Sequence, residues 1–392
     1  RMKGRVQLGL GVFRQGRVLP FSQLQRQVSG SVSWSSFRRH AFLRSPDGLP
    51  KLSHQLLLDD FETFARRLGE ACRVADGGAG CLLLTELPND LSRLHEELMS
   101  SGREFFALPV MEKEKVGYQQ SPEFRGYMRQ GAENTAGAVD EREQLEFGRE
   151  EARPSIARAE GGMLHSRLRG PNQWPAEPPS LKPLMLRWLQ EMEELSRRLT
   201  QALSLSLGLE ATALDHYFRE PHVQAKLVHY PPPQDRGDGS LGVGAHCDSG
   251  FLTLLWQDAS GGLEFLDAHG RWIPATPQAA SLVCNLGEVV QLLSAGVYPA
   301  TVHRVLRPKQ AVGRLSLPYF WNPSLDAEIE ALDLQQPVAN LRGRPPASEN
   351  KMMLSYGMNA FKSLARSHPK VFARHHPDLT CLADGSVVYK ET

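Results

Sequence analysis

Seven short apolar runs fall between residues 222 and 330, and Pro, Gly, Asp and Asn separate them. Short runs at regular spacing, divided by turn-forming residues, are typical of the strands in an antiparallel barrel or jelly roll. The runs are 225–230, 252–256, 263–266, 282–285, 289–293, 302–306 and 315–320. This part of the chain is therefore predicted to form a β core.

The segments before and after this core have a helical period. Apolar residues recur at three- and four-residue steps in 57–74, 89–106, 181–207 and 356–367. A short buried strand is expected at 81–84, and residues 149–180 are expected to form a partly irregular connection. The last helix should end before Pro369. The predicted fold class is α+β, with an N-terminal helical region, a jelly-roll core and a C-terminal helix.

The N-terminal segment differs from the rest in charge. Residues 1–46 contain nine Lys and Arg and no Asp or Glu, so the formal net charge of +1 conceals a net charge of about −8 over residues 47–392. A basic, Ser-rich and acid-free N-terminus is typical of a transit peptide for a mitochondrion or plastid. A disordered basic tail, with the protein in the cytoplasm, is the alternative. The acidic remainder argues against a nucleic-acid partner.

Other features favour an intracellular protein with no membrane span. The five cysteines are widely spread and form no Cys-x-x-Cys pair, which argues against a disulfide framework and a structural zinc site. No uncharged apolar stretch reaches 18 residues. The apolar share of 41% and the charged share of 23% are ordinary for a globular protein.

Three residues have the spacing of a metal site. His246 and Asp248 would project from the same face of a strand, because strand side chains alternate with a period of two. His303, in a later strand-like run, would supply a third ligand. Two imidazoles and one carboxylate on one side of an ion leave its other positions open, and this arrangement suits ferrous iron in oxygenases. Alone, a His-x-Asp pair is more often an ordinary surface pair, so the prediction depends on its context.

That context includes Arg314 and Ser316, which would share one face of the strand after His303. A guanidinium binds a carboxylate through two hydrogen bonds, and a hydroxyl adds another donor. The pair is therefore a candidate site for the far carboxylate of a 2-keto diacid beside the metal. A structural salt bridge for Arg314 is the alternative.

Taken together, these motifs resemble the isopenicillin N synthase-like dioxygenases that depend on Fe(II) and 2-oxoglutarate. The resemblance extends from about residue 52 to about residue 378 and implies a double-stranded β-helix, the jelly roll of this family. The matching motifs, in chain order, are 105–109 (FFALP), 125–127 (RGY), 246–258 (HCDSGFLTLLWQD), 262–265 (GLEF), 270–274 (GRWIP), 285–288 (NLGE), 303–305 (HRV) and 314–316 (RLS).

The resemblance implies specific roles. The iron ligands would be His246, Asp248 and His303, and 2-oxoglutarate would be bound by Arg314, Ser316 and Tyr230. Many members of the family have Asn two residues before that Tyr, where this chain has Val228. Fe(II), 2-oxoglutarate and O2 would be required, with ascorbate as an additional reductant.

Three further residues are candidate substrate contacts, namely Arg125, Tyr127 and Phe251. In the resembling family the region around Arg125 contributes to the mouth of the active site, and an Arg beside aromatic rings can bind an anionic metabolite. In the alternative, Arg125 pairs with one of the acids between 140 and 146, and Tyr127 packs in the core.

The expected activity is that of an oxidoreductase. A small-molecule metabolite would be hydroxylated, desaturated or closed into a ring, with release of succinate and CO2. The alternatives are an iron oxidase of the same fold that does not consume 2-oxoglutarate, and a non-catalytic binding protein. The sequence does not indicate the substrate or the oligomeric state.

The predicted organisation has five parts. They are a basic presumed transit peptide or tail (1–46), an N-terminal dioxygenase region (52–180), a long helix and connection (181–221), the Fe(II) and 2-oxoglutarate jelly-roll core (222–330) and a C-terminal extension with a helix (331–392).

Overall fold

The computed structural model describes most of the chain after residue 47. The described residues are 48–132, 134–135, 138–139, 141–154, 163–232, 241–307, 313–334, 353–382 and 384–390. The basic segment that the sequence predicts as a transit peptide lies outside them, so that prediction stays untested. Within the described residues, no helix is both long and apolar enough to cross a membrane.

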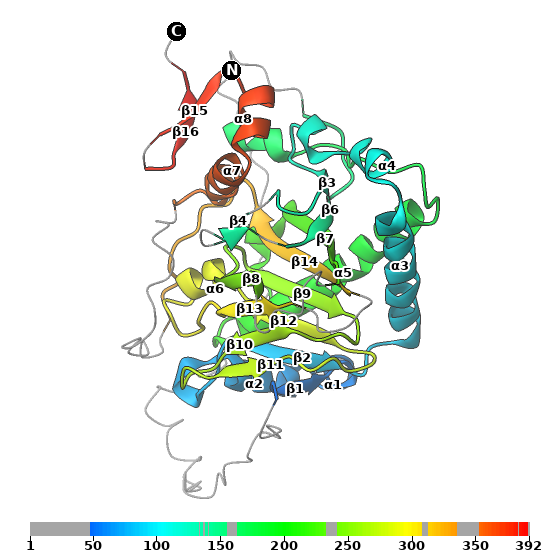
Figure 1. The fold of residues 1–392 in the computed structure, drawn as a ribbon. Helices are drawn as coiled ribbons and strands as arrows, with labels where there is room; N and C mark the ends of the chain where they lie inside the picture. Colours follow the sequence, from blue (N-terminus) through cyan, green and yellow to red (C-terminus); the bar gives the residue numbers. More distant parts are fainter. Residues whose placement is uncertain are drawn as a thin grey trace, which may run out of the picture. The chain divides into compact units, whose positions relative to one another are not determined.

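The core consists of two β-sheets (Figure 1). The larger sheet has eight strands, in the order β1 (Lys51–Ser53), β2 (Cys81–Thr85), β12 (Leu282–Leu286), β9 (Leu252–Gln257), β14 (Arg314–Ser324), β7 (Pro221–Tyr230), β6 (Glu143–Gly148) and β3 (Gly126–Met128). The smaller sheet has the order β11 (Trp272–Pro274), β10 (Leu263–Leu266), β13 (His303–Leu306) and β8 (Leu241–His246). Strands β7 to β14 form the jelly roll, which confirms the predicted fold class.

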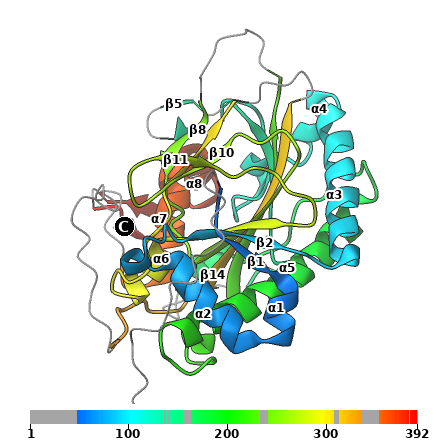
Figure 2. The ribbon, with the colours of Figure 1, turned by 90° about the horizontal axis from the view of Figure 1, so that it is seen from below.

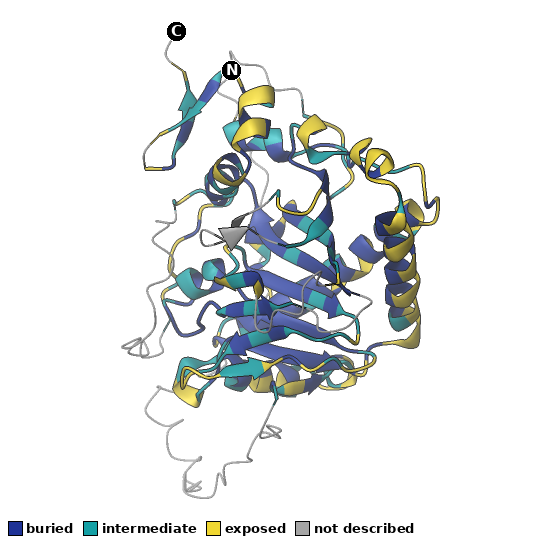
Figure 3. Cartoon of the chain, in the orientation of Figure 1, coloured by how far each residue is buried: buried dark blue, intermediate teal, exposed yellow. Residues whose placement is uncertain are grey.

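Three long helices cover the outer face of the larger sheet. They are α2 (Phe61–Cys72), α3 (Asn89–Ala107) and α5 (Leu181–Ser206). Figure 2 shows α5 beside α2 and the short helix α1 (His54–Asp59), below the strands. The apolar stripe of α5 is buried against the sheet, and the indole of Trp321 on β14 donates a hydrogen bond of 3.0 Å to the hydroxyl of Thr200. Figure 3 shows the resulting pattern, with buried strands and exposed outer helix faces.

The remaining elements lie at the edges of the core. They are α4 (Val110–Glu114), β4 (Asn134–Thr135), β5 (Ala138–Val139), α6 (Glu288–Leu293), α7 (Tyr356–Ser367), α8 (Pro369–His375), β15 (Leu379–Cys381) and β16 (Val387–Tyr389). The predicted helix at 356–367 is therefore confirmed, but it is not the last helix, because α8 begins at Pro369. A proline at the first position of a helix loses no hydrogen bond, so it starts α8 as readily as it ends α7.

Two further predictions about secondary structure are wrong. The run 289–293 is not a strand but most of helix α6. The segment 57–74 is not one helix, because Asp60 separates α1 from α2 and caps α2 through a hydrogen bond of 3.0 Å from the amide of Thr63. The expected helical region also contributes strands β1, β2, β3 and β6 to the larger sheet, of which only β2 was predicted.

Candidate metal centre

The structure brings His246, Asp248 and His303 together. His246 is the last residue of β8, His303 is the first residue of β13, and the two lie opposite each other in the register of these strands. The Oδ1 atom of Asp248 is 3.9 Å from Nε2 of His246 and 3.7 Å from Nε2 of His303. One ligand atom from each residue lies within 4.8 Å of the others, which is close enough for all three to bind one ion.

The backbone at Asp248 differs from the prediction. Strand β8 ends at His246, so Asp248 lies in the loop that follows and not in the strand. Helix α6 anchors that loop, because the amides of Glu288 and Val289 donate hydrogen bonds of 2.9 and 3.0 Å to the carbonyls of Asp248 and Gly250. The start of the mispredicted helix thus fixes the candidate carboxylate ligand.

Hydrogen bonds orient each ligand. Nδ1 of His246 contacts the carbonyl of Gly244 at 2.8 Å, and Nδ1 of His303 contacts the carbonyl of Thr301 at 3.1 Å. A proton on each Nδ1 satisfies these carbonyls, so both Nε2 atoms keep the lone pair that a metal requires.

Burial and charge favour the metal-binding protonation states. Burial, aided by the neighbouring His303, lowers the pKa of His246 to about 4, so its imidazole is neutral at physiological pH. Burial alone would raise the pKa of Asp248, but the two imidazoles and two hydrogen-bond donors hold it below its ordinary value. Neutral imidazoles and an ionised carboxylate are the forms that coordinate a cation. The donor set therefore fits ferrous iron, with one side left open.

A buried cation lies beside this site. Arg314 is 0% exposed, and its guanidinium donates to the carbonyl of Gly261 at 2.8 Å and to the hydroxyl of Ser316 at 2.9 Å. It also lies over the ring of Tyr230, 5.0 Å from the ring centre. Among the described residues, no carboxylate forms an ion pair with Arg314, and burial lowers its pKa. Such a charge is costly unless an anion binds it.

The three candidate metal ligands and the three predicted 2-oxoglutarate contacts line one cavity between the two sheets. Its volume is about 500 Å³, including space open to solvent. The described lining residues are Arg142, Val228, Tyr230, Val243, His246, Asp248, Thr253, Leu255, Leu263, Asn285, His303, Val305, Arg314, Ser316, Pro318 and Phe320.

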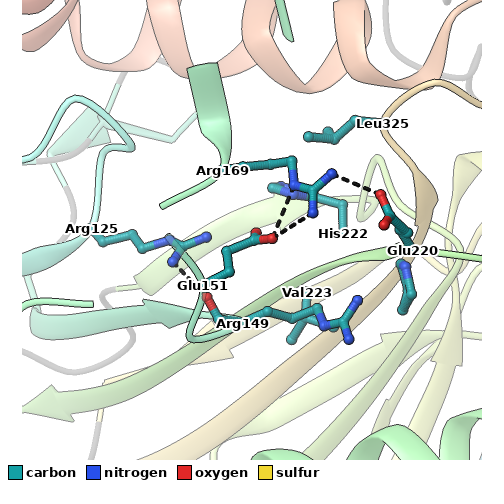
Figure 4. Close-up of a pocket in the computed structure, with 9 residues that line it drawn as sticks. Arg125, Arg149, Glu151, Arg169, Glu220, His222, Val223 and Leu325 are labelled. Atoms are coloured by element: carbon teal, nitrogen blue, oxygen red, sulfur yellow. Dashed lines mark hydrogen bonds and ion pairs between the residues drawn. The ribbon is translucent and has the colours of Figure 1, made fainter. Parts of the chain in front are cut away.

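Arg125 is not among these residues. It lines a separate cavity together with Arg149, Glu151 and Arg169, which Figure 4 shows. Its guanidinium is buried and donates to the carbonyls of Arg149 and Gly170. The structure therefore gives Arg125 a role in holding loops, and the alternative, a pairing with one of the acids between 140 and 146, is not found among the hydrogen bonds of the described residues.

Tyr127 and Phe251 also lie outside the lining of the metal cavity. Tyr127 is buried, and its hydroxyl donates a hydrogen bond of 2.7 Å to Glu143. Phe251 is buried against Phe218, at a ring-centre distance of 4.8 Å. Both are packing residues in this structure, as the sequence-based alternative for Tyr127 proposed.

Comparison with known proteins identifies the family. Residues 221–323 match the model of the 2OG-Fe(II) oxygenase superfamily, and residues 49–177 match that of the N-terminal region of non-haem dioxygenases in morphine synthesis. A homoarginine-6-hydroxylase from Arabidopsis thaliana is 33% identical over 272 residues, which are 68% of this chain and 72% of that protein. A 2-oxoglutarate-dependent dioxygenase from Dothideomycetidae sp. is 31% identical over 296 residues, with 73% and 79% covered.

Solved structures agree with this assignment. A putative 2OG-Fe(II) oxygenase from Caulobacter crescentus has a TM-score of 0.65 and 28% identity, with 82% of this chain and 99% of that chain covered. A Neurospora crassa protein in complex with alpha-KG and thymine has a TM-score of 0.63 and 26% identity, with 85% and 98% covered. Members of this family use Fe(II) as the metal cofactor, with 2-oxoglutarate and O2 as cosubstrates, whereas the use of ascorbate stays a prediction. The chain belongs to the 2OG-Fe(II) oxygenase superfamily, and it is a 2-oxoglutarate-dependent dioxygenase that oxidises a small molecule.

Proposed function

We propose that this enzyme hydroxylates a C–H bond of a small metabolite and that Arg314 and Ser316 hold the far carboxylate of 2-oxoglutarate. The observation that carries the proposal is the buried guanidinium of Arg314, which has no carboxylate partner among the described residues and lies in the same cavity as the metal ligands. A dicarboxylate with one end at the metal and the other at Arg314 would compensate that charge.

Different residues of the cavity have different roles in this reaction. Bound iron supplies the redox centre at which O2, 2-oxoglutarate and R–H become R–OH, succinate and CO2. His246, Asp248 and His303 would hold the iron on one side and leave the other open. Apolar side chains such as Leu255, Val305 and Phe320 would exclude water from the reacting atoms.

Several relatives of this chain are named as hydroxylases, which favours hydroxylation over desaturation and ring closure. Proteins from Arabidopsis thaliana, Glycine max and Oryza sativa, which are 30–33% identical to this chain, are homoarginine-6-hydroxylases. Homoarginine itself fits the cavity poorly. Asp248 is the one carboxylate among its described lining residues, and Asp248 is committed to the metal. A cationic substrate side chain would therefore lack a counter-charge there, and we expect a different substrate.

The test is a screen of a metabolite library with the purified Fe(II) protein. Each compound is incubated with and without 2-oxoglutarate, and succinate and the mass of the product are measured. The proposal expects succinate in proportion to a product that has gained one oxygen atom. A product that forms equally well without 2-oxoglutarate would support the oxidase alternative instead.

A further inference from the structure

Arg142 projects into the metal cavity from the strand next to the jelly roll. It directly precedes β6, in which Glu143 lies opposite His229 and Gln144 lies opposite Val228 of β7. Continuing this register by one residue places Arg142 opposite Tyr230. Because side chains alternate along a strand, Arg142 shares the inward face with Val228 and Tyr230, and all three line the cavity.

The backbone on both sides of Arg142 is firmly held. The carboxylate of Glu143 accepts hydrogen bonds of 2.7 Å from Lys113 and 2.7 Å from Tyr127, and it contacts His229 at 2.9 Å. On the other side, Glu141 forms an ion pair with Arg307, which follows β13. These anchors fix where the side chain of Arg142 can reach, and a site on a rigid element positions a ligand better than one on a loose loop.

The charge of Arg142 adds to the positive charge of the cavity. Besides burial, which is the larger cause, Arg142 contributes to the lowered pKa of Arg314. Its guanidinium therefore lies within electrostatic range of Arg314. The two guanidinium groups make the described lining of the cavity more positive than Arg314 alone would make it.

Each of the other described polar residues of the cavity has a role in holding the metal or the cosubstrate. Three are metal ligands, Thr253 and Asn285 hold Asp248, and Tyr230, Arg314 and Ser316 form the proposed cosubstrate site. The rest of the described lining is apolar. The cavity thus combines apolar walls with the cationic side chain of Arg142, beside the candidate metal ligands and the proposed cosubstrate site.

We propose that Arg142 binds an anionic group of the primary substrate, and that the substrate class is a small metabolite with an apolar body and a carboxylate. This inference rests on the proposed function. A guanidinium pairs with a carboxylate through two parallel hydrogen bonds, so it would fix both the identity and the orientation of the substrate. The apolar body would then lie along Leu255, Pro318 and Phe320, near the open side of the metal.

The experiment compares an acid with its amide in the anaerobic complex of the protein with Fe(II) and saturating 2-oxoglutarate, which occupies the Arg314 site. The probes are hexanoate and hexanamide, which have the same shape but differ in charge. Their dissociation constants are measured by calorimetry for the wild type, Arg142→Gln and the control Arg271→Gln. The control removes one positive charge from the exposed end of the β10–β11 hairpin, where Arg271 pairs with Asp267, and leaves the anchors of Arg142 and every described lining residue of the cavity in place.

The wild type should bind hexanoate about tenfold more tightly than hexanamide. This preference should disappear in Arg142→Gln and persist in Arg271→Gln. Equal binding of acid and amide by the wild type would overturn the proposal, even if Arg142→Gln fails to fold, and so would a preference that survives in Arg142→Gln.

A separate titration tests whether Arg142 binds 2-oxoglutarate instead of the primary substrate. The charge-transfer absorption of the Fe(II) and 2-oxoglutarate complex reports cosubstrate binding without turnover. Arg142→Gln should leave the dissociation constant of 2-oxoglutarate within about twofold of the wild type, as expected of a side chain outside that contact set. An increase of tenfold or more would overturn the assignment to the substrate. Absence of this absorption in the wild type would instead refute the proposed function.

Discussion

Asn285 donates a hydrogen bond of 2.8 Å from Nδ2 to Oδ2 of Asp248, and this contact turns the other carboxylate oxygen towards the two histidines. The hydroxyl of Thr253 donates to the same Oδ2 at 2.6 Å. Thr253 on β9 and Asn285 on β12 lie opposite each other in the larger sheet, while both histidines come from the smaller sheet. The site is therefore assembled only when the two sheets pack together.

The first prediction concerns the hydrogen bond from Thr253 to Asp248. Thr253→Val keeps the shape of the side chain but removes a donor to Asp248, so Fe(II) affinity should fall about 10- to 100-fold, as for other outer-shell partners of metal ligands. Equilibrium dialysis against Fe(II) measures this. Thr85→Val is the matched control, because the Thr85 hydroxyl is also buried in the sheet but bonds to the carbonyl of Leu52. Equal loss in both variants would mean that the effect is not specific to Asp248.

The second prediction concerns the histidine ligands. His246→Ala and His303→Ala should each abolish succinate formation, because two remaining ligands hold ferrous iron poorly. Iron content and turnover are measured together, with His269→Ala, an exposed histidine on the β10–β11 hairpin, as the control. Unchanged iron stoichiometry in both ligand variants would refute the assignment of the ligands.

The third prediction concerns Arg314. Arg314→Lys should raise the KM for 2-oxoglutarate at least tenfold, because a point charge cannot replace the two-pronged contact of a guanidinium. Arg304→Lys serves as the control, since Arg304 pairs with Glu264 and stacks on Trp272 outside the described cavity lining. If Arg314→Lys instead raises the KM of the primary substrate alone, Arg314 binds that substrate and the oxidase alternative gains support.

The fourth prediction concerns the pH dependence of stability. His95 is fully buried and stacks on Trp256 at a ring-centre distance of 4.2 Å, and neither ring nitrogen has a hydrogen-bond partner among the described residues. Burial lowers the pKa of His95 from its ordinary 6.5 to about 3. The unfolded chain therefore binds a proton between these pH values that the folded chain excludes, so stability falls as the pH drops from 6.5 towards 3.

His95→Phe should remove this contribution, which amounts to about 2 kcal/mol between pH 7 and pH 5. Denaturant unfolding at both pH values measures the difference, with the exposed His269→Gln as the control. The loss of stability on acidification should be smaller in His95→Phe than in the wild type and the control. An identical loss in all three proteins would contradict a buried neutral His95.

The sequence predicted the architecture well where one element carries a clear pattern. The stripe of α5 and the short runs that became β9, β10 and β12 needed no tertiary information. The run 289–293 is different, because five apolar residues in a row fit a buried strand and a helix equally well. Tertiary contacts decide between them, since the amides at the start of α6 bond to the loop that carries Asp248.

The candidate site was also predicted only in part from the sequence. Spacing and residue type pointed to His246, Asp248 and His303, although the assumption of a continuous strand was wrong. Arg142 was not predicted as a site residue, because only the pairing of β6 with β7 reveals that it lies on the face that lines the cavity. Arg125 was predicted as a substrate contact because aromatic residues flank it, but local sequence cannot show that its donors are bonded to the carbonyls of Arg149 and Gly170.

The most direct test of the assigned activity is whether an oxygen atom of O2 enters succinate. The purified protein is incubated with Fe(II), 2-oxoglutarate and oxygen-18 gas, and the succinate is analysed by mass spectrometry, with His246→Ala in parallel. A 2-oxoglutarate-dependent dioxygenase should place one oxygen-18 atom in each succinate molecule, in an amount that depends on Fe(II) and vanishes in His246→Ala. Succinate without the label, or labelled succinate at the same rate in His246→Ala, would contradict the account.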